Sequence, residues 1–172
     1  MLKKLTQTFR DMGTIKTLCE AAEQIANAEH QPAPGAEHFV LAALELPDGS
    51  AARVFRKLGI SAGAFREALR DVHRAALMAA GVNAEDVAGS ERDVPPLPRP
   101  SGPYNAAPSG EAVLNGLAAL RKRGVTGPLI GAHVLEVVSA MQHGPSAHAF
   151  ARLGRDAPTV MAAIQSEMAM AA

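Results

Sequence analysis

The chain repeats itself along its length. When the sequence is laid on itself with an offset of 95 residues, residues 14–72 and 109–167 come into register without a gap. The matched positions are those that helices need, because apolar residues meet apolar residues and helix-ending glycines meet each other. The register is clearest where identical residues pair: His38 with His133, Phe55 with Phe150, Leu58 with Leu153 and Gly59 with Gly154. We therefore predict two copies of one structural unit.

The composition predicts that this unit is helical. Hydrophobic residues make up 48% of the chain but aromatic residues only 3%, so its apolar content consists mostly of small side chains that favour helices. We expect an all-α fold of two pseudo-symmetric four-helix repeats. The expected organisation is a lead-in over 1–13, a first repeat over 14–80, a proline-rich linker over 81–108 and a second repeat over 109–172.

Capping residues and turns predict the helices of each repeat. In the first repeat we expect helices at about 14–29, from 36, 50–58 and from 62. Thr14 and Ser61 are the expected N-caps, and Gly59 is expected to end the third helix in the left-handed conformation. The second repeat carries the same signals, with Ser109 and Asp156 as N-caps and Gly154 in the place of Gly59.

The segment from Val94 to Pro103 is too rich in proline for a helix or a central strand. We expect an extended tether between the repeats. The alternative is a ligand for a proline-recognising domain, although a connector is already required at this place.

Charge excludes two classes of partner. The chain has 17 basic and 17 acidic side chains, so it offers no excess of positive charge to nucleic acid or to anionic lipid. No run approaches the roughly 18 apolar residues that span a bilayer, and the first ten residues lack the apolar core of a signal peptide. We expect a cytoplasmic protein. The single cysteine, Cys19, falls inside a helical pattern and is expected to be a packed thiol.

Two segments of the first repeat carry a resemblance to a known family. Residues 37–44, EHFVLAAL, followed by residues 51–60, AARVFRKLGI, resemble the Clp amino-terminal repeat. That repeat occurs twice at the front of Clp unfoldases such as ClpA, ClpB and ClpC. The resemblance covers both repeats of this chain and implies a pseudo-twofold bundle of eight helices.

The resemblance implies binding without catalysis. The unfoldases continue into ATPase modules, whereas nothing in this chain matches the P-loop pattern G-x-x-x-x-G-K-[ST]. We expect a free-standing domain that needs no cofactor, is not an enzyme and is monomeric. It would act as an adaptor, competitor or decoy that binds protein substrates or Clp ATPase and protease components. The alternative is an assembly factor that docks on a Clp ATPase, or self-associates, without recognising a degron.

Glu37 is the main candidate for ligand binding. In ClpC-type relatives each repeat carries Gly-Thr-Glu-His at the start of its second helix, and the acid contacts the guanidinium of phosphoarginine. Here the first repeat has Glu37, whereas the second has Ala132, whose methyl group cannot pair with a guanidinium. The resemblance thus implies one site, with asymmetric binding in the first repeat. The alternative is that Glu37 only stabilises a helix N-terminus.

The remaining candidates have structural explanations. His38 and His133 recur at one repeat position and are expected to be buried and hydrogen-bonded to a loop carbonyl. His143 and His148 lack neighbouring ligands, so no metal site is expected. Ser50, Ser61, Ser109 and Ser146 fit helix caps rather than nucleophiles, and no second catalytic group accompanies Glu37.

Two binding surfaces are expected: a pocket at Glu37 and a groove between the repeats. Methionines of the last helix are expected to fill the core rather than form a contact surface; they are Met161, Met168 and Met170.

Overall fold

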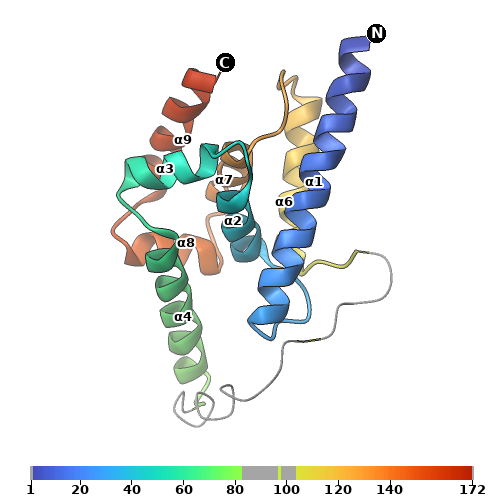
Figure 1. Ribbon diagram of the computed structural model, residues 1–172. Helices are drawn as coiled ribbons and strands as arrows, with labels where there is room; N and C mark the ends of the chain where they lie inside the picture. Colours follow the sequence, from blue (N-terminus) through green and yellow to red (C-terminus); the bar gives the residue numbers. More distant parts are fainter. Residues whose placement is uncertain (1, 83–96, 98–103, 172) are drawn as a thin grey trace.

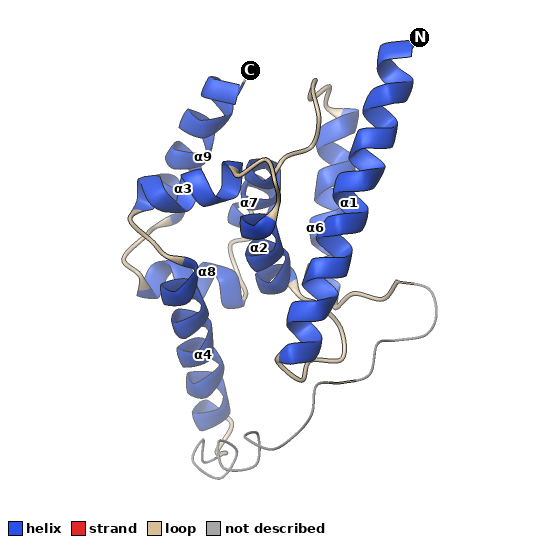
Figure 2. Ribbon diagram, viewed as in Figure 1, coloured by secondary structure: helices blue, strands red, loops and turns tan. Residues whose placement is uncertain are grey.

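The structure is a computed structural model, and it describes residues 2–82, 97 and 104–171. Within these residues it has eight α-helices and no strand (Figure 2), which confirms the predicted all-α fold. The helices of the first repeat are α1 (Leu2–Ala28), α2 (Ala36–Glu45), α3 (Ser50–Leu58) and α4 (Ala62–Ala79). The helices of the second repeat are α6 (Pro108–Lys122), α7 (Gly131–Ser139), α8 (Pro145–Arg152) and α9 (Ala157–Ala171).

Two short, mostly apolar helices form the centre of the molecule. Helices α2 and α7 are in contact there, and the other helices surround them (Figure 1). All residues of α2 from Ala36 to Ala43 are buried, and so are most of α7. A helix that is apolar on all sides is stable only inside a core. The two equivalent helices therefore meet because neither has a face suited to water.

Three phenylalanines join the repeats next to this centre. The rings of Phe55 and Phe65 in the first repeat lie 5.5 Å apart, and the ring of Phe150 in the second lies 5.9 Å from Phe55 and 4.9 Å from Phe65. The two pairs that include Phe55 meet edge to face, an arrangement that aromatic rings favour. The chain has five phenylalanines and one tyrosine, so half of its aromatic residues lie at this junction.

The helix ends mostly follow the sequence signals. Gly59 and Gly154 have φ angles of 67° and 70°, the left-handed conformation that glycine adopts without strain. Ser61 caps α4 by accepting a hydrogen bond from the Ala64 N–H, and Asp156 caps α9 by accepting one from the Thr159 N–H. The expected tether at 94–103 lies outside the described residues, apart from Leu97.

Two predicted N-caps are wrong. Helix α1 begins at Leu2, so Thr14 lies within it rather than at its start. The helix continues through Gly13 because one glycine costs only about 1 kcal/mol in a helix and no proline interrupts the segment. Helix α6 begins at Pro108, and its N-cap is Ala107 rather than Ser109. Proline is favoured in the first turn because its missing N–H would have no partner there.

Candidate functional site

The candidate site is the start of α2, where Glu37 lies. The side chain of Glu37 folds back along the helix start, so that a Cβ atom on Gly35 would lie 2.6 Å from Glu37 Oε1. This side chain is 10% exposed. Its Oε2 atom is buried and has no hydrogen-bond partner among the described residues. The first turn of α2 therefore holds a carboxylate whose hydrogen-bonding capacity is partly unused.

His38 fixes the conformation of this helix start. Its Nδ1 atom accepts a hydrogen bond of 2.8 Å from the Gly35 N–H, so the proton of the neutral ring belongs on Nε2. Nε2 lies 3.3 Å from a carboxylate oxygen of Glu29. Burial opposes ionisation of Glu29, but the neighbouring His38 ring and the charge of Arg66 outweigh it and lower the pKa of this carboxyl.

The partner of His38 differs from the prediction. His38 and His133 are both buried, as expected. However, each ring accepts a hydrogen bond from a backbone N–H at the start of its own helix, Gly35 for His38 and Ile130 for His133, rather than donating one to a loop carbonyl. The recurring histidine thus serves as a local helix cap at the same place in both repeats.

Helix α6 of the second repeat closes one side of the α2 start. The hydroxyl oxygen of Ser109 accepts a hydrogen bond of 3.1 Å from the Ala36 N–H. Next to it, Gly110 lies so close that a Cβ atom there would overlap the carbonyl oxygen of Pro34 and lie 3.0 Å from the ring of Phe39. A glycine is required at this contact because the two backbones touch. Ser109 therefore caps a helix of the other repeat rather than its own.

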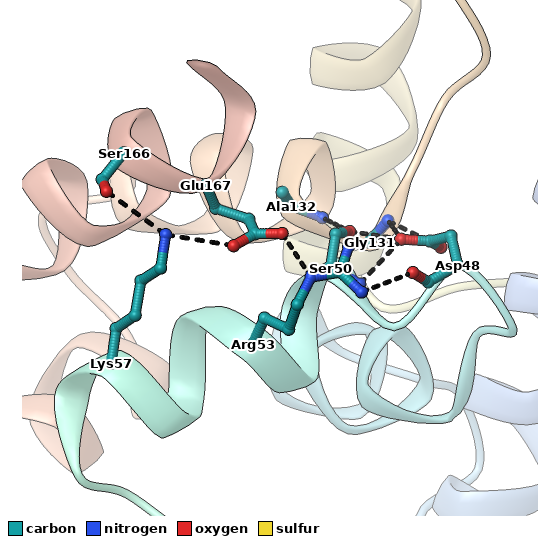
Figure 3. A network of polar contacts seen from close by, with 8 residues as sticks. All are labelled: Asp48, Ser50, Arg53, Lys57, Gly131, Ala132, Ser166 and Glu167. Carbon is teal, nitrogen blue, oxygen red and sulfur yellow. Dashed lines mark hydrogen bonds and ion pairs between the residues drawn. The ribbon is translucent and has the colours of Figure 1, made fainter. Parts of the chain in front are cut away.

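The start of α7 is the equivalent place in the second repeat, and side chains of the first repeat accept hydrogen bonds from its backbone (Figure 3). The Gly131 N–H lies 3.1 Å from Asp48 Oδ2, and the Ala132 N–H donates a hydrogen bond of 2.8 Å to the hydroxyl of Ser50. Asp48 also accepts hydrogen bonds from the backbone N–H and the hydroxyl of Ser50. Ala132 is fully buried. The amides that would receive an anionic ligand there already have partners.

An ion-pair group continues this network to α9 (Figure 3). Glu167 is 2% exposed, and its carboxylate lies 2.5 Å from Arg53 Nε and 3.1 Å from Lys57 Nζ. Burial opposes its ionisation, but the hydrogen bonds from these two cations prevail and lower its pKa. The network thus connects α3 of the first repeat with α7 and α9 of the second.

A cavity of about 330 Å³ lies between the repeats beside the α7 start. It is lined by Gly13, Thr14 and Thr17 of α1, by residues 46–48 and by residues 128–130. The expected groove between the repeats therefore has a counterpart here. This cavity and the second one, described below, do not include Glu37, so the expected pocket at that residue is not among them.

The structure places the predicted residues in three groups. Glu37 and His38 lie together at the α2 start, Ala132 and His133 at the α7 start, and Gly59 and Gly154 at helix ends. The sequence analysis missed the roles of Asp48, Ser50 and Ser109 at the helix starts of the opposite repeat. The turn P-D-G-S at residues 47–50 carries a signal for a capping acid, but not for which helix it caps.

The last helix contributes to the core through some of its methionines. Met168 is partly buried against the core, whereas Met170 is 68% exposed. In the part of the chain that the structure describes, no group of three metal-ligating side chains comes together. Among the same residues, no helix is long and apolar enough to cross a membrane.

Comparison with known proteins gives one positive result. A family model described as the Clp repeat (R) N-terminal domain matches residues 14–123, which include the first repeat and α6. No curated protein matches the chain.

Proposed function

The chain belongs to the Clp repeat N-terminal domain family, and we propose that it binds protein substrates of a Clp unfoldase system at the start of α2. The family consists of non-catalytic modules of the Clp system that generally mediate protein interactions. The finer proposal is that the ligand is an arginine-phosphorylated protein and that Glu37 makes the main polar contact. The chain would then act as an adaptor, a competitor or a decoy.

The observation that supports this proposal is the partly unpaired carboxylate of Glu37. A buried carboxylate oxygen without a hydrogen-bond partner is unfavourable for the free protein. A guanidinium group satisfies it, because its planar array of N–H groups can donate two parallel hydrogen bonds to a carboxylate. The adjacent helix N-terminus favours a negatively charged group. Phosphoarginine offers both charges on one side chain.

Binding requires the Glu37 side chain to change rotamer. The carboxylate now lies against Gly35, and the side chain is 10% exposed. Since Oε2 has no hydrogen bond to lose, rotation toward solvent breaks little and allows its hydration. The proposal therefore includes a local movement of one side chain and no rearrangement of helices.

The second repeat supports a stoichiometry of one. It has Ala132 in place of the acid, and Asp48 and Ser50 already accept hydrogen bonds from the first two amides of α7. An arriving phosphate would meet the negative charge of Asp48 at close range. We expect one molecule of ligand per chain.

The test is isothermal titration calorimetry with free phosphoarginine, with unmodified arginine as a control. Wild-type protein should bind close to one equivalent of phosphoarginine, and Glu37→Gln should bind at least about tenfold more weakly because it keeps the shape but removes the charge. Asp48→Asn keeps an oxygen that can accept the hydrogen bond from the Gly131 N–H. This variant should therefore not gain a second equivalent of tight binding at the α7 start. Failure of the wild type to bind, or equal binding by Glu37→Gln, would refute the role of Glu37.

A second candidate function rests on the far end of α4. This end projects from the bundle (Figure 1), and its apolar side chains Leu77, Met78 and Val82 are at least 36% exposed. Exposed apolar patches often mark protein contacts. An assembly factor would use such a surface to dock on a folded Clp ATPase. Capture of a purified Clp ATPase that Met78→Asp abolishes, without capture of arginine-phosphorylated casein, would favour this function.

A further inference from the structure

The second repeat contains an apolar cavity that the proposed function does not use. It has a volume of about 350 Å³ and lies between the C-terminal part of α7, helix α8 and the start of α9. Phe150 and Val160, which are 5% and 1% exposed, belong to its apolar wall together with Val138 and Met141. Polar side chains border it as well, among them Arg155 and Asp156.

Divergence between the repeats accounts for this space. At the offset of 95 residues, Val160 corresponds to Phe65 and Arg155 corresponds to Ile60. Phe65 is fully buried and Ile60 is 7% exposed, so both positions are filled by large apolar groups in the first repeat. The second repeat has a smaller side chain at one position and a charged one at the other. The same helical framework therefore leaves a cavity with a cation beside it.

Arg155 is held in place at this cavity by backbone oxygens. Its Nε atom donates a hydrogen bond of 2.7 Å to the Leu58 carbonyl, and Nη1 lies 3.3 Å from the carbonyl oxygen of Gly154. Among the described residues it has no acidic partner within ion-pair distance. The one acid in the wall, Asp156, accepts a hydrogen bond from the Thr159 N–H at the start of α9. Arg155 is thus an oriented guanidinium with unused donors.

We propose that this cavity binds the C-terminal residue of a partner polypeptide, with an apolar side chain in the cavity and the terminal carboxylate on Arg155. The apolar wall favours an apolar side chain, which loses contact with water there. The guanidinium selects a carboxylate next to that side chain, because it can donate two parallel hydrogen bonds to it. In a polypeptide, a carboxylate directly on the residue that bears the apolar side chain occurs only at the C-terminus.

This site is separate from Glu37, so the two proposals can fail independently. The cavity lies in the second repeat and has Arg155 and Asp156 in its wall, whereas the α2 start lies in the first repeat and has the carboxylate of Glu37. A substrate protein would be able to contact both. The inference shares with the proposed function only the premise that the chain binds proteins.

The test uses a fluorescein-labelled heptapeptide, Gly-Ser-Gly-Ser-Gly-Ala-Leu, with a free carboxylate and, as its matched control, with a C-terminal amide. Fluorescence anisotropy should show binding of the free acid and at least about tenfold weaker binding of the amide. A third peptide that ends in serine should also bind at least about tenfold more weakly than the leucine peptide, since it lacks the apolar group.

Two variants assign the binding to this cavity. Arg155→Gln should weaken the free acid to the level of the amide and leave the amide unchanged. Val160→Phe places the residue of the first repeat in the cavity and should abolish binding of both peptides. Val160→Ile fills less of the cavity and should weaken binding of both; it serves as the test if Val160→Phe does not fold. Glu37→Gln should bind the peptide as the wild type does. Equal affinity for acid and amide, or an Arg155→Gln variant that still distinguishes them, would overturn the proposal.

Discussion

The starts of α2 and α7 occupy the same place in the two repeats, yet they differ in what satisfies them. Both have a buried histidine that accepts a backbone hydrogen bond. At α2 the carboxylate of Glu37 has an oxygen without a partner among the described residues, and Ser109 of the other repeat accepts a hydrogen bond from the Ala36 N–H. At α7 Ala132 stands in place of that acid, and Asp48 and Ser50 supply hydrogen-bond acceptors for the helix start.

The same helix start therefore has different hydrogen-bond partners in the two repeats. At α7 the first two amides of the helix both donate to side chains of the first repeat, so this helix start contributes to the junction of the repeats. At α2 part of the bonding capacity of an acid stays unused, which is unfavourable for stability but leaves it available to a ligand. A helix start can serve stability or recognition, and the proposed function assigns recognition to the α2 start.

The largest expected effect is that of Ala132→Glu, which restores an acid to the second repeat. Ala132 is fully buried, and a Cβ atom on the neighbouring Gly131 would lie 2.9 Å from both the Ala43 oxygen and the Ala51 methyl group. A carboxylate there has neither space nor a partner. We expect a loss of about 3–5 kcal/mol in the free energy of unfolding, the usual cost of an uncompensated buried charge. Urea denaturation measures it.

Ala132→Gln is the matched control, because it adds nearly the same volume without the charge. It should cost less than Ala132→Glu, and the difference between the two variants isolates the electrostatic part. If Ala132→Glu lost less than about 1 kcal/mol, the α7 start would have room for an acid as the α2 start does. The comparison between the two repeats would then lose its physical basis.

The next effect is that of Gly110→Ala, which attacks the closure of the α2 start by α6. The added Cβ would overlap the Pro34 carbonyl oxygen, so the two backbones must move apart. Overpacking of this kind costs about 1–3 kcal/mol. Gly13→Ala is the control at an open position in α1, where no atom lies within 4 Å of the added Cβ. It should gain up to about 1 kcal/mol from helix propensity. Equal thermal midpoints for the two variants would contradict the close contact.

The sequence allows the fold to be predicted more fully than the site. The repeat, the glycines at 59 and 154 and the breaks between helices suffice for the all-helical architecture, because these signals act locally. The hydroxyl groups of Ser50 and Ser109 do not reveal their partners in the same way. Each lies near the start of its own helix, as a cap would, but accepts its hydrogen bond from a helix of the other repeat.

The reason is that capping an opposite helix depends on how the repeats pack. A sequence pattern shows which residues can accept a hydrogen bond from a helix start, whereas the tertiary structure decides which helix start is within reach. The same limit applies to Glu37, whose position in the sequence indicates an acid at a helix start but not its burial or its unpaired oxygen. The cavity beside Val160 likewise depends on tertiary packing, although the exchange of Phe65 for a smaller residue is visible in the sequence.

Smaller effects are expected when the capping side chains Asp48 and Ser109 are removed one at a time. Asp48→Ala removes the acceptor for the Gly131 N–H and for the Ser50 N–H, so it should cost about 1–2 kcal/mol, as loss of a good N-cap does. Ser109→Ala removes a single hydrogen bond to the Ala36 N–H and should cost about 0.5–1 kcal/mol. Chemical denaturation of both variants ranks them. A larger loss for Ser109→Ala would show that the α2 start depends more on its internal cap.

The pH dependence of stability offers a test confined to the α7 start. Burial lowers the pKa of His133 below its ordinary value of 6.5, with nearby charges as secondary influences. The unfolded chain then binds a proton more readily than the folded one, so the free energy of unfolding should fall as the pH falls below about 6.5. His133→Asn keeps an acceptor for the Ile130 N–H and should reduce this fall. An unchanged slope in the variant would contradict the assignment.

Two carboxylates with lowered pKa values add a separate effect at lower pH. The pKa values of Glu29 and Glu167 are both lowered from 4.5, because the groups beside them outweigh the effect of burial. These groups are His38 and Arg66 at Glu29, and Arg53 and Lys57 at Glu167. Their contribution to stability is present above about 4.5 and is lost as the pH falls through the lowered values. Measurements between pH 5 and 7 therefore report mainly on histidine.

The smallest expected effect on stability is that of Glu37→Gln. The sign of this stability change distinguishes the α2 start from the α7 start. The substitution removes a buried charge with an unpaired oxygen, which is favourable, and also removes an anion from a helix N-terminus, which costs about 0.3–1 kcal/mol. We expect a net change within about 1 kcal/mol, toward greater stability. Asp48→Asn, at the α7 start, should instead destabilise the protein, because that carboxylate accepts hydrogen bonds from three donors. Thermal unfolding of both variants is measured together with phosphoarginine titration of Glu37→Gln. The two measurements distinguish an acid that binds ligand, as proposed for Glu37, from an acid that stabilises the fold, as expected for Asp48. A Glu37→Gln variant that is markedly less stable than the wild type would assign Glu37 to the fold.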